Sequence, residues 1–168
     1  MKLLFVGKTD FQYNRDLILL NGLKRRTDVI VETLQIHKRD WATFKQIREH
    51  SKSVDFVVIP SFRHKDVAYV KLASKAPVVF DPLISKFMTR VLDYGVKWKG
   101  PHKYVVDWLA FFWHDILIWD TRSHKDYLQK KYGLKKPMHP IYIGADTTLF
   151  YPNNIPDITW LDTPSTIR

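Results

Sequence analysis

Residues 77–85 read Pro-Val-Val-Phe-Asp-Pro-Leu-Ile-Ser and contain a short apolar run that ends directly in an aspartate. The run at 77–80 predicts a buried strand, because a few apolar residues bounded by turn-forming residues are typical of strands in a sheet core. The segments on either side, 65–74 and 83–94, predict helices. A buried strand between two helices is the repeating unit of a parallel sheet, so this stretch indicates an α/β fold.

The same alternation continues in both directions along the chain. Strands are predicted at 2–6, 29–36, 55–60, 77–80, 115–119 and 138–143. Helices are predicted at 14–26, 41–50, 65–74, 83–94, 104–113 and 123–133. This order predicts a Rossmann-like parallel sheet of about six strands with helices on both faces. We expect it to form one domain over residues 1–150, followed by a linker or tail over 151–168.

Two helices carry more specific predictions. Val105, Trp108, Leu109, Phe112 and Trp113 follow helical spacing, and we expect this stripe to pack against the sheet. The last helix is expected to begin with a capping box at its first residues, 123–126.

Composition limits the classes of partner. The 168 residues have a formal net charge of +10 and 45% hydrophobic residues, typical of a folded domain that attracts anions. The absence of cysteine excludes disulfides and thiolate sites and is compatible with the cytoplasm. The apolar run at 3–6 is too short for a signal peptide or a membrane span.

Ligands of parallel α/β sheets bind beyond the carboxyl ends of the strands. That rule selects the short segments 7–9, 37–38, 61–64, 121–122 and 144–146, together with Asp81. Gly7 and Lys8 predict either a tight turn or a close approach to a phosphate, and His64 either an ordinary histidine or a substrate contact. Asp81 predicts a contact with substrate hydroxyls, a helix N-cap, or both.

Several catalytic motifs are absent from the sequence. The spacing around Gly7 does not form a phosphate-binding P-loop, and no G-x-G-x-x-G motif is present. No Asp-x-Asp or His-Glu-x-x-His pattern occurs either, so we expect no metal and no bound cofactor. Within 86–103, Lys97, Trp98, Lys99 and Lys103 predict a surface for an anionic membrane or a polyanion, or else a solvated loop.

Four stretches together resemble the N-terminal domain of GT-B glycosyltransferases of the family 4 type, which are retaining and use nucleotide sugars. They are 2–7, 77–85, 115–121 and 139–152. The last is similar to the family's interdomain junction, V-x-x-G-x-D-x-x-x-F-x-P, with Asp146, Phe150 and Pro152 at the required offsets.

The resemblance implies the acceptor-binding half of such an enzyme. Arg63, His64, Asp81 and Ser85 would line the acceptor pocket. Gly7 and Lys8 would face the donor phosphates, and Gly144, Asp146, Phe150 and Pro152 would form the interdomain hinge. The family's second domain, which binds most of the nucleotide-sugar donor and carries an E-x7-E pair, has no counterpart in the 168 residues. We therefore expect negligible turnover from this chain alone.

The resemblance also implies partners. A glycan or lipid-linked acceptor is expected, with attachment to the inner face of the membrane through the basic segment and catalysis only with a C-terminal domain. The rival hypothesis is a non-catalytic basic module that binds anionic lipid, a glycan or a separately encoded catalytic partner. Nucleic acid is a weaker alternative, because no recognition motif is present and the basic residues are spread along the chain.

Overall fold

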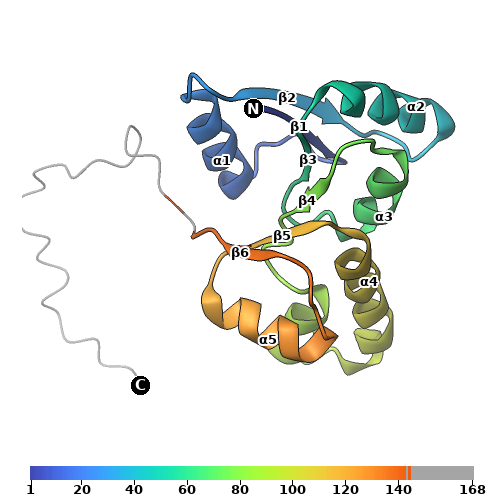
Figure 1. Cartoon of the computed structure of the whole chain (residues 1–168). Helices are drawn as coiled ribbons and strands as arrows, with labels where there is room; N and C mark the ends of the chain where they lie inside the picture. The colour runs from blue at the N-terminus through green and yellow to red at the C-terminus, as the bar shows by residue number, and fades with distance from the viewer. Residues whose placement is uncertain (143, 145–168) are drawn as a thin grey trace, which may run out of the picture.

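The computed structural model describes residues 1–142 and 144, apart from the side chain of Lys99, and shows a single parallel sheet. The sheet order is β2-β1-β3-β4-β5-β6, and every neighbouring pair is parallel (Figure 1). The strands are β1 (Lys2–Gly7), β2 (Ile30–Gln35), β3 (Phe56–Ile59), β4 (Val78–Phe80), β5 (Ile116–Trp119) and β6 (Met138–Pro140). The predicted α/β fold with six strands is confirmed.

Helices connect the strands and lie on both faces of the sheet (Figure 1). They are α1 (Asn14–Lys24), α2 (Trp41–His50), α3 (His64–Ala73), α4 (Gly100–Trp113) and α5 (Arg122–Tyr132). Three short helices lie between them: η1 (Ser51–Ser53), η2 (Met88–Asp93) and η3 (Lys97–Lys99). The predicted domain boundary near residue 150 lies outside the described residues.

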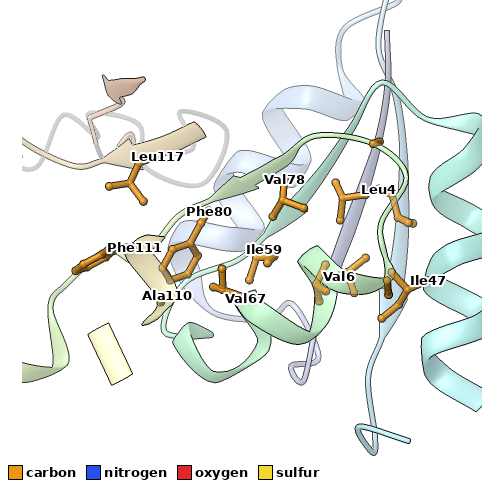
Figure 2. Packing of buried hydrophobic residues seen from close by; sticks show 14 of the residues in the cluster. Leu4, Val6, Ile47, Ile59, Val67, Val78, Phe80, Ala110, Phe111 and Leu117 are labelled. Atoms are coloured by element: carbon orange, nitrogen blue, oxygen red, sulfur yellow. The ribbon is translucent and has the colours of Figure 1, made fainter. Parts of the chain in front are cut away.

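Alternate residues of each strand divide the core into two parts. Leu4 and Val6 of β1 point into the larger part, where α2, α3, α4 and α5 cover the sheet (Figure 2). Leu3 and Phe5 point to the opposite face and pack with Leu20 of α1. This period of two follows from strand geometry, and because helices cover both faces, the central strands β1, β3 and β4 are apolar on both sides.

The apolar stripe of α4 does not pack against the sheet. Val105, Trp108, Leu109 and Phe112 are exposed, by 51%, 44%, 41% and 57% respectively, and only Trp113 of the stripe is partly buried. The prediction for this helix was therefore wrong. The buried face instead carries Asp107, Ala110 and Phe111, because Asp107 accepts hydrogen bonds inside the domain and turns the helix toward them.

The starts of two helices also differ from the prediction. The cap of α5 is Thr121, whose hydroxyl accepts a hydrogen bond from the His124 amide at 3.2 Å, so the box expected at 123–126 is not its cap. The helix expected at 83–94 begins only at residue 86 and continues as the π-helical η2. Ser85 caps it, with its hydroxyl accepting from the Met88 amide at 3.0 Å.

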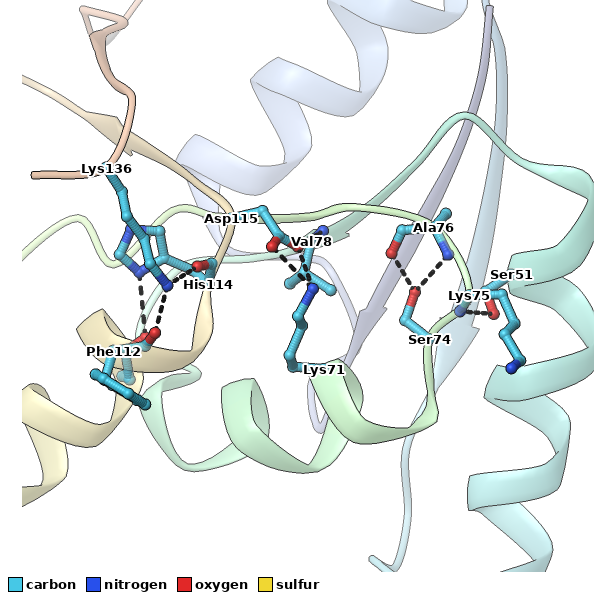
Figure 3. A network of polar contacts seen from close by, with 11 residues as sticks. Ser51, Lys71, Ser74, Lys75, Ala76, Val78, Phe112, His114, Asp115 and Lys136 are labelled. Carbon is cyan, nitrogen blue, oxygen red and sulfur yellow. Dashed lines mark hydrogen bonds and ion pairs between the residues drawn. The ribbon is translucent and has the colours of Figure 1, made fainter.

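Polar contacts fasten the helices to the amino ends of the strands (Figure 3). Lys71 of α3 donates to both oxygens of Asp115, at 2.8 and 2.6 Å, and Asp115 also accepts from the Val78 amide at 2.7 Å. Because Asp115 precedes β5 and Val78 begins β4, one carboxylate joins α3 to two strands. This edge has a structural role.

Within the described part of the chain, no helix has the length and apolar character needed to cross a membrane.

Candidate functional site

The loops beyond the carboxyl ends of β1, β3 and β4 contain an unusual backbone feature. Phe11, Phe62 and Leu83 follow these three strands, and all have positive φ angles, of 61°, 63° and 60°. The left-handed conformation costs an L-residue about 1–2 kcal/mol, and such residues cluster at ligand-binding and catalytic sites. The loops at this edge therefore have the backbone strain that is typical of functional sites.

A buried ion pair lies at the same edge. The Nε of Arg15 donates to Asp81 Oδ2 at 2.7 Å, and the two residues are only 4% and 1% exposed. A second guanidinium nitrogen, Nη2, donates to the carbonyl of Ile141 at 3.2 Å. Arg15, on the first turn of α1, thereby connects the ends of β4 and β6. The Arg15 side chain reaches these strand ends because Arg15 is in the first turn of α1, which faces them.

Asp16 extends this cluster to the end of β3. Its Oδ1 accepts a hydrogen bond from the Ser61 amide at 3.0 Å, and the Ser61 side chain is buried beside it. Burial raises the pKa of the Asp16 carboxyl, while the Ser61 hydrogen bonds and the charges of Arg15 and Arg63 act in the opposite direction. The cluster thus combines two buried carboxylates with two guanidinium groups.

Burial also raises the pKa of Asp81, to about 6, although the charge and hydrogen bond of Arg15 favour its ionised form. Desolvation of a carboxylate can outweigh one paired cation when both groups lie in a low-dielectric interior. Asp81 is therefore mainly ionised at neutral pH and gains a proton in mildly acidic solution. An ionised carboxylate of this kind accepts hydrogen bonds from the hydroxyl groups of a ligand.

Two donors of the cluster have no hydrogen-bond partner within the described residues. They are Nη1 of Arg15 and Nε of Arg63, and both atoms are buried. Buried donors are almost always paired in proteins, so an unpaired guanidinium nitrogen here is a donor available to a polar ligand or to water. Asp16 and Asp81 also line an apolar cavity of about 260 Å³, walled by Leu3, Phe5, Leu19, Val79 and Ile116 among others. A ligand with a hydroxylated head and an apolar part fits that combination.

The predicted acceptor residues fall into two groups. Asp81 and Arg63 belong to the cluster around Arg15, and Asp81 closes a turn by accepting from the Leu83 amide at 3.2 Å rather than capping a helix. His64 and Ser85 instead lie in a buried network on the α4 side of the sheet. The sequence prediction grouped four residues of which the structure brings two to the same cluster.

That second network is centred on Asp107. Its Oδ2 accepts from the Ser85 hydroxyl at 2.6 Å and from the Tyr132 hydroxyl at 3.3 Å, and its Oδ1 lies 3.5 Å from His64 Nε2. Burial lowers the pKa of His64 to about 3, so its ring is neutral at physiological pH. The ring also contacts Phe80 edge-on at 5.1 Å. These contacts join α3, α4 and α5 and indicate a structural role.

The turn after β1 is packed tightly. A Cβ on Gly7 would lie 3.0 Å from Pro60 Cγ, which accounts for glycine at this position without a ligand. The Lys8 amide donates to Asp66 Oδ2 at 3.1 Å, and Arg39 pairs with Asp66 as well. The Lys8 side chain is exposed, so it remains a candidate for contact with donor phosphates.

The remaining predicted residues are placed as follows. Gly144 is exposed beside α1, while Asp146, Phe150 and Pro152 lie outside the described residues. Lys97 and Trp98 are exposed before α4, and Trp98 is 79% exposed. Lys103 is partly buried, and the side chain of Lys99 is outside the described part.

Arg15 and Asp16 are the site residues that sequence reasoning missed, whereas Ser61 lies in the segment 61–64 that the strand-end rule selected. The available signal was the Arg15-Asp16 pair in the first turn of the helix after β1, where both charges are next to the strand ends.

No group of three histidine, aspartate or glutamate residues arranged to hold a metal ion occurs among residues 1–142 and 144. No model of a protein family matches the chain, and no curated protein matches it either.

Proposed function

We propose that this chain is the acceptor-binding half of a retaining, nucleotide-sugar-dependent glycosyltransferase that acts in glycan or glycolipid synthesis. The observation that supports it is the buried cluster of Arg15, Asp16 and Asp81 at the carboxyl edge of a parallel sheet. Carboxylates beside guanidinium groups recognise sugar hydroxyls, since the carboxylates accept and the guanidinium groups donate hydrogen bonds.

In a retaining transfer the acceptor hydroxyl must be held on the face that the leaving phosphate departs from. Positioning then contributes more than a strong general base does. Asp81 and Arg15 would hold the acceptor, and the exposed Lys8 would face the donor from across the cleft. The donor itself would be bound by a second domain, so we expect no turnover when a nucleotide sugar and an acceptor are added to this chain alone.

Binding of an alkyl glycoside tests the acceptor role directly. Octyl β-glucoside has the hydroxylated head and apolar tail that the cluster and its cavity fit, and its titration can be followed by NMR of the labelled protein. Asp81→Asn should weaken binding by about tenfold, because one charge-assisted hydrogen bond contributes about 1.5–3 kcal/mol. Asp28→Asn removes an exposed carboxylate and should change nothing. Equal affinity of all three proteins would refute the proposal.

A second candidate is a non-catalytic module that binds anionic lipid. It is favoured by the exposed apolar face of α4, formed by Val105, Trp108, Leu109 and Phe112, where Lys136 Nζ lies 5.7 Å from the centroid of the Phe112 ring. Aromatic residues beside lysines suit the headgroup region of a membrane. In a sedimentation assay at low salt, the wild type should pellet with phosphatidylserine vesicles. The Trp108→Ser/Phe112→Ser variant should stay in the supernatant. Absence of wild-type binding would remove this candidate.

A further inference from the structure

A second pocket at the carboxyl edge is lined by cationic side chains. It has a volume of about 200 Å³ and is formed by Phe62, Ile84, Lys86, Thr89, Arg90 and Lys103. A water molecule occupies about 30 Å³ in the liquid, so the pocket has room for a group several times larger. The residues come from the loops after β3 and β4, from the helix at 86–93 and from α4.

The positive charges around this pocket are not balanced by nearby acids. Lys86, Arg90 and Lys103 line it, and Arg63 and Lys65 are close enough for their charges to act on Lys86. Burial and then the charge of Lys103 lower the pKa of Lys86, which is the direction expected for a cation among cations. A bound anion would relieve this repulsion.

The nearby carboxylate of Asp107 offsets one of these positive charges and leaves the others in excess. It raises the pKa of Lys86, but it is buried and accepts hydrogen bonds from the Ser85 hydroxyl and from the Phe87 amide at 2.9 Å. The Met88 amide also donates to Ser85. Amides of this first helical turn are therefore engaged, and an anion in the pocket would be held by side chains.

We infer that this pocket binds a phosphoryl group, held by Lys86, Arg90 and Lys103. A phosphate offers several acceptor oxygens to converging cations, and such charge-assisted bonds are the strong ones. The pocket is three residues from the acceptor cluster, since Ile84 lines it and Asp81 belongs to the cluster. Three residues span at most about 11 Å, so Asp81 and Ile84 lie within the length of one small molecule. If the proposed acceptor role holds, the acceptor is then a phosphorylated, hydroxyl-bearing molecule.

The primary test measures the binding of inorganic phosphate and of pyrophosphate to the protein, by calorimetry or NMR titration at low ionic strength. Lys86→Gln/Lys103→Gln should weaken binding by about tenfold or more, and Lys45→Gln/Lys52→Gln removes the same charge from the surface around α2. The control variant should bind as the wild type does. No binding by the wild type, or equal weakening in both double variants, would overturn the inference. Circular dichroism and melting temperature establish that the variants are folded.

Two further arms identify the source of the phosphate. Vesicles containing phosphatidic acid present a phosphate at a membrane, whereas glucose 1-phosphate presents it in solution. Preference for the vesicles assigns a lipid headgroup, and preference for the soluble ester assigns a phosphosugar. If Lys86→Gln/Lys103→Gln binds both the vesicles and glucose 1-phosphate as tightly as the wild type does, the assignment of phosphate binding to this pocket is refuted.

The outcomes also separate this inference from the acceptor proposal. Asp81→Asn should leave inorganic phosphate binding unchanged, and Lys86→Gln/Lys103→Gln should leave octyl β-glucoside binding unchanged. Loss of phosphate binding in Asp81→Asn would overturn the assignment of the phosphate to a separate pocket. If octyl β-glucoside does not bind but phosphate does, the acceptor proposal fails and the phosphate pocket is still supported.

Discussion

Replacing Arg15 by methionine should destabilise the protein in a pH-dependent manner. The substitution removes the cation but retains an unbranched side chain of similar length, so it leaves the buried Asp81 carboxylate without its partner. Removing one member of a buried ion pair costs about 3–5 kcal/mol when the remaining charge stays ionised. The loss should be this large near pH 8.

Near pH 5 the loss should fall to about 1–2 kcal/mol. Burial raises the pKa of Asp81 to about 6 in the folded protein, above its ordinary 3.8, so its stabilising contribution is complete below pH 3.8 and is lost as pH rises through 6. Arg15 lowers the pKa of Asp81, so the pKa rises further when Arg15 is removed. Each pH unit by which a pKa changes on folding corresponds to about 1.4 kcal/mol of unfolding free energy. In mild acid the carboxyl of the variant is neutral, and mainly a hydrogen bond is missing.

Urea unfolding followed by circular dichroism measures both values. Arg26→Met is a matched control, because Arg26 pairs with Asp28 at 2.9 Å on the surface, where both side chains are more than 60% exposed. The pKa of Asp28 is lowered through its hydrogen bond with Arg26, but water screens this exposed pair, so the control should lose far less stability than Arg15→Met loses at pH 8. An equal loss for Arg15→Met at pH 5 and pH 8 would refute the reasoning.

Three further predictions concern packing, titration and capping. Gly7→Ala should cost about 1–3 kcal/mol in unfolding free energy, because its Cβ would lie 3.0 Å from Pro60 Cγ, whereas Gly22→Ala meets nothing within 4 Å and should stabilise by about 0.5–1 kcal/mol. The stability contributed by neutral His64 is complete above pH 6.5 and is lost as pH falls toward 3, so His64→Phe should flatten the acid limb of the melting-temperature profile; an unchanged profile would contradict this. Ser85→Ala should cost about 2–4 kcal/mol, because it removes both a helix cap and a hydrogen bond to the buried Asp107 carboxylate; a loss below measurement error would contradict both contacts.

The strands were predictable because a short apolar run has few alternatives in a domain of this size. The predicted strand at 29–36 differs by one residue at each end from the observed β2, and the run at 77–80 differs from the observed β4 only at its first residue. A strand buried on both faces needs apolar residues at every position, and that pattern is local. Helix faces are harder, because periodicity identifies a stripe without saying what covers it.

The α4 helix illustrates that limit. Trp108 and Phe112 have the larger apolar surface, yet Asp107 and Phe111 face the interior. The burial of Asp107 is stabilised by hydroxyls from Ser85 and Tyr132, which are 22 and 25 residues away in sequence. Such long-range partners cannot be read from helical spacing.

The cluster around Arg15 was predicted in part for a related reason. Asp81 and Arg63 were found because strand ends can be located from local patterns. Arg15 was missed because its partner, Asp81, is 66 residues further along the chain, and no local pattern predicts that contact.

The order of the strands has a consequence for synthesis on the ribosome. β1 is the first strand made, and it pairs with both β2 and β3, so a three-stranded unit is complete once Ile59 has emerged. β4, β5 and β6 then join the same edge in the order in which they are translated. Until each arrives, the preceding strand is an apolar edge open to wrong pairing. Because the strands are added in the order of translation, this exposure is brief at each step. Pro140, at the end of β6, lacks an amide hydrogen and so offers no donor to a further strand.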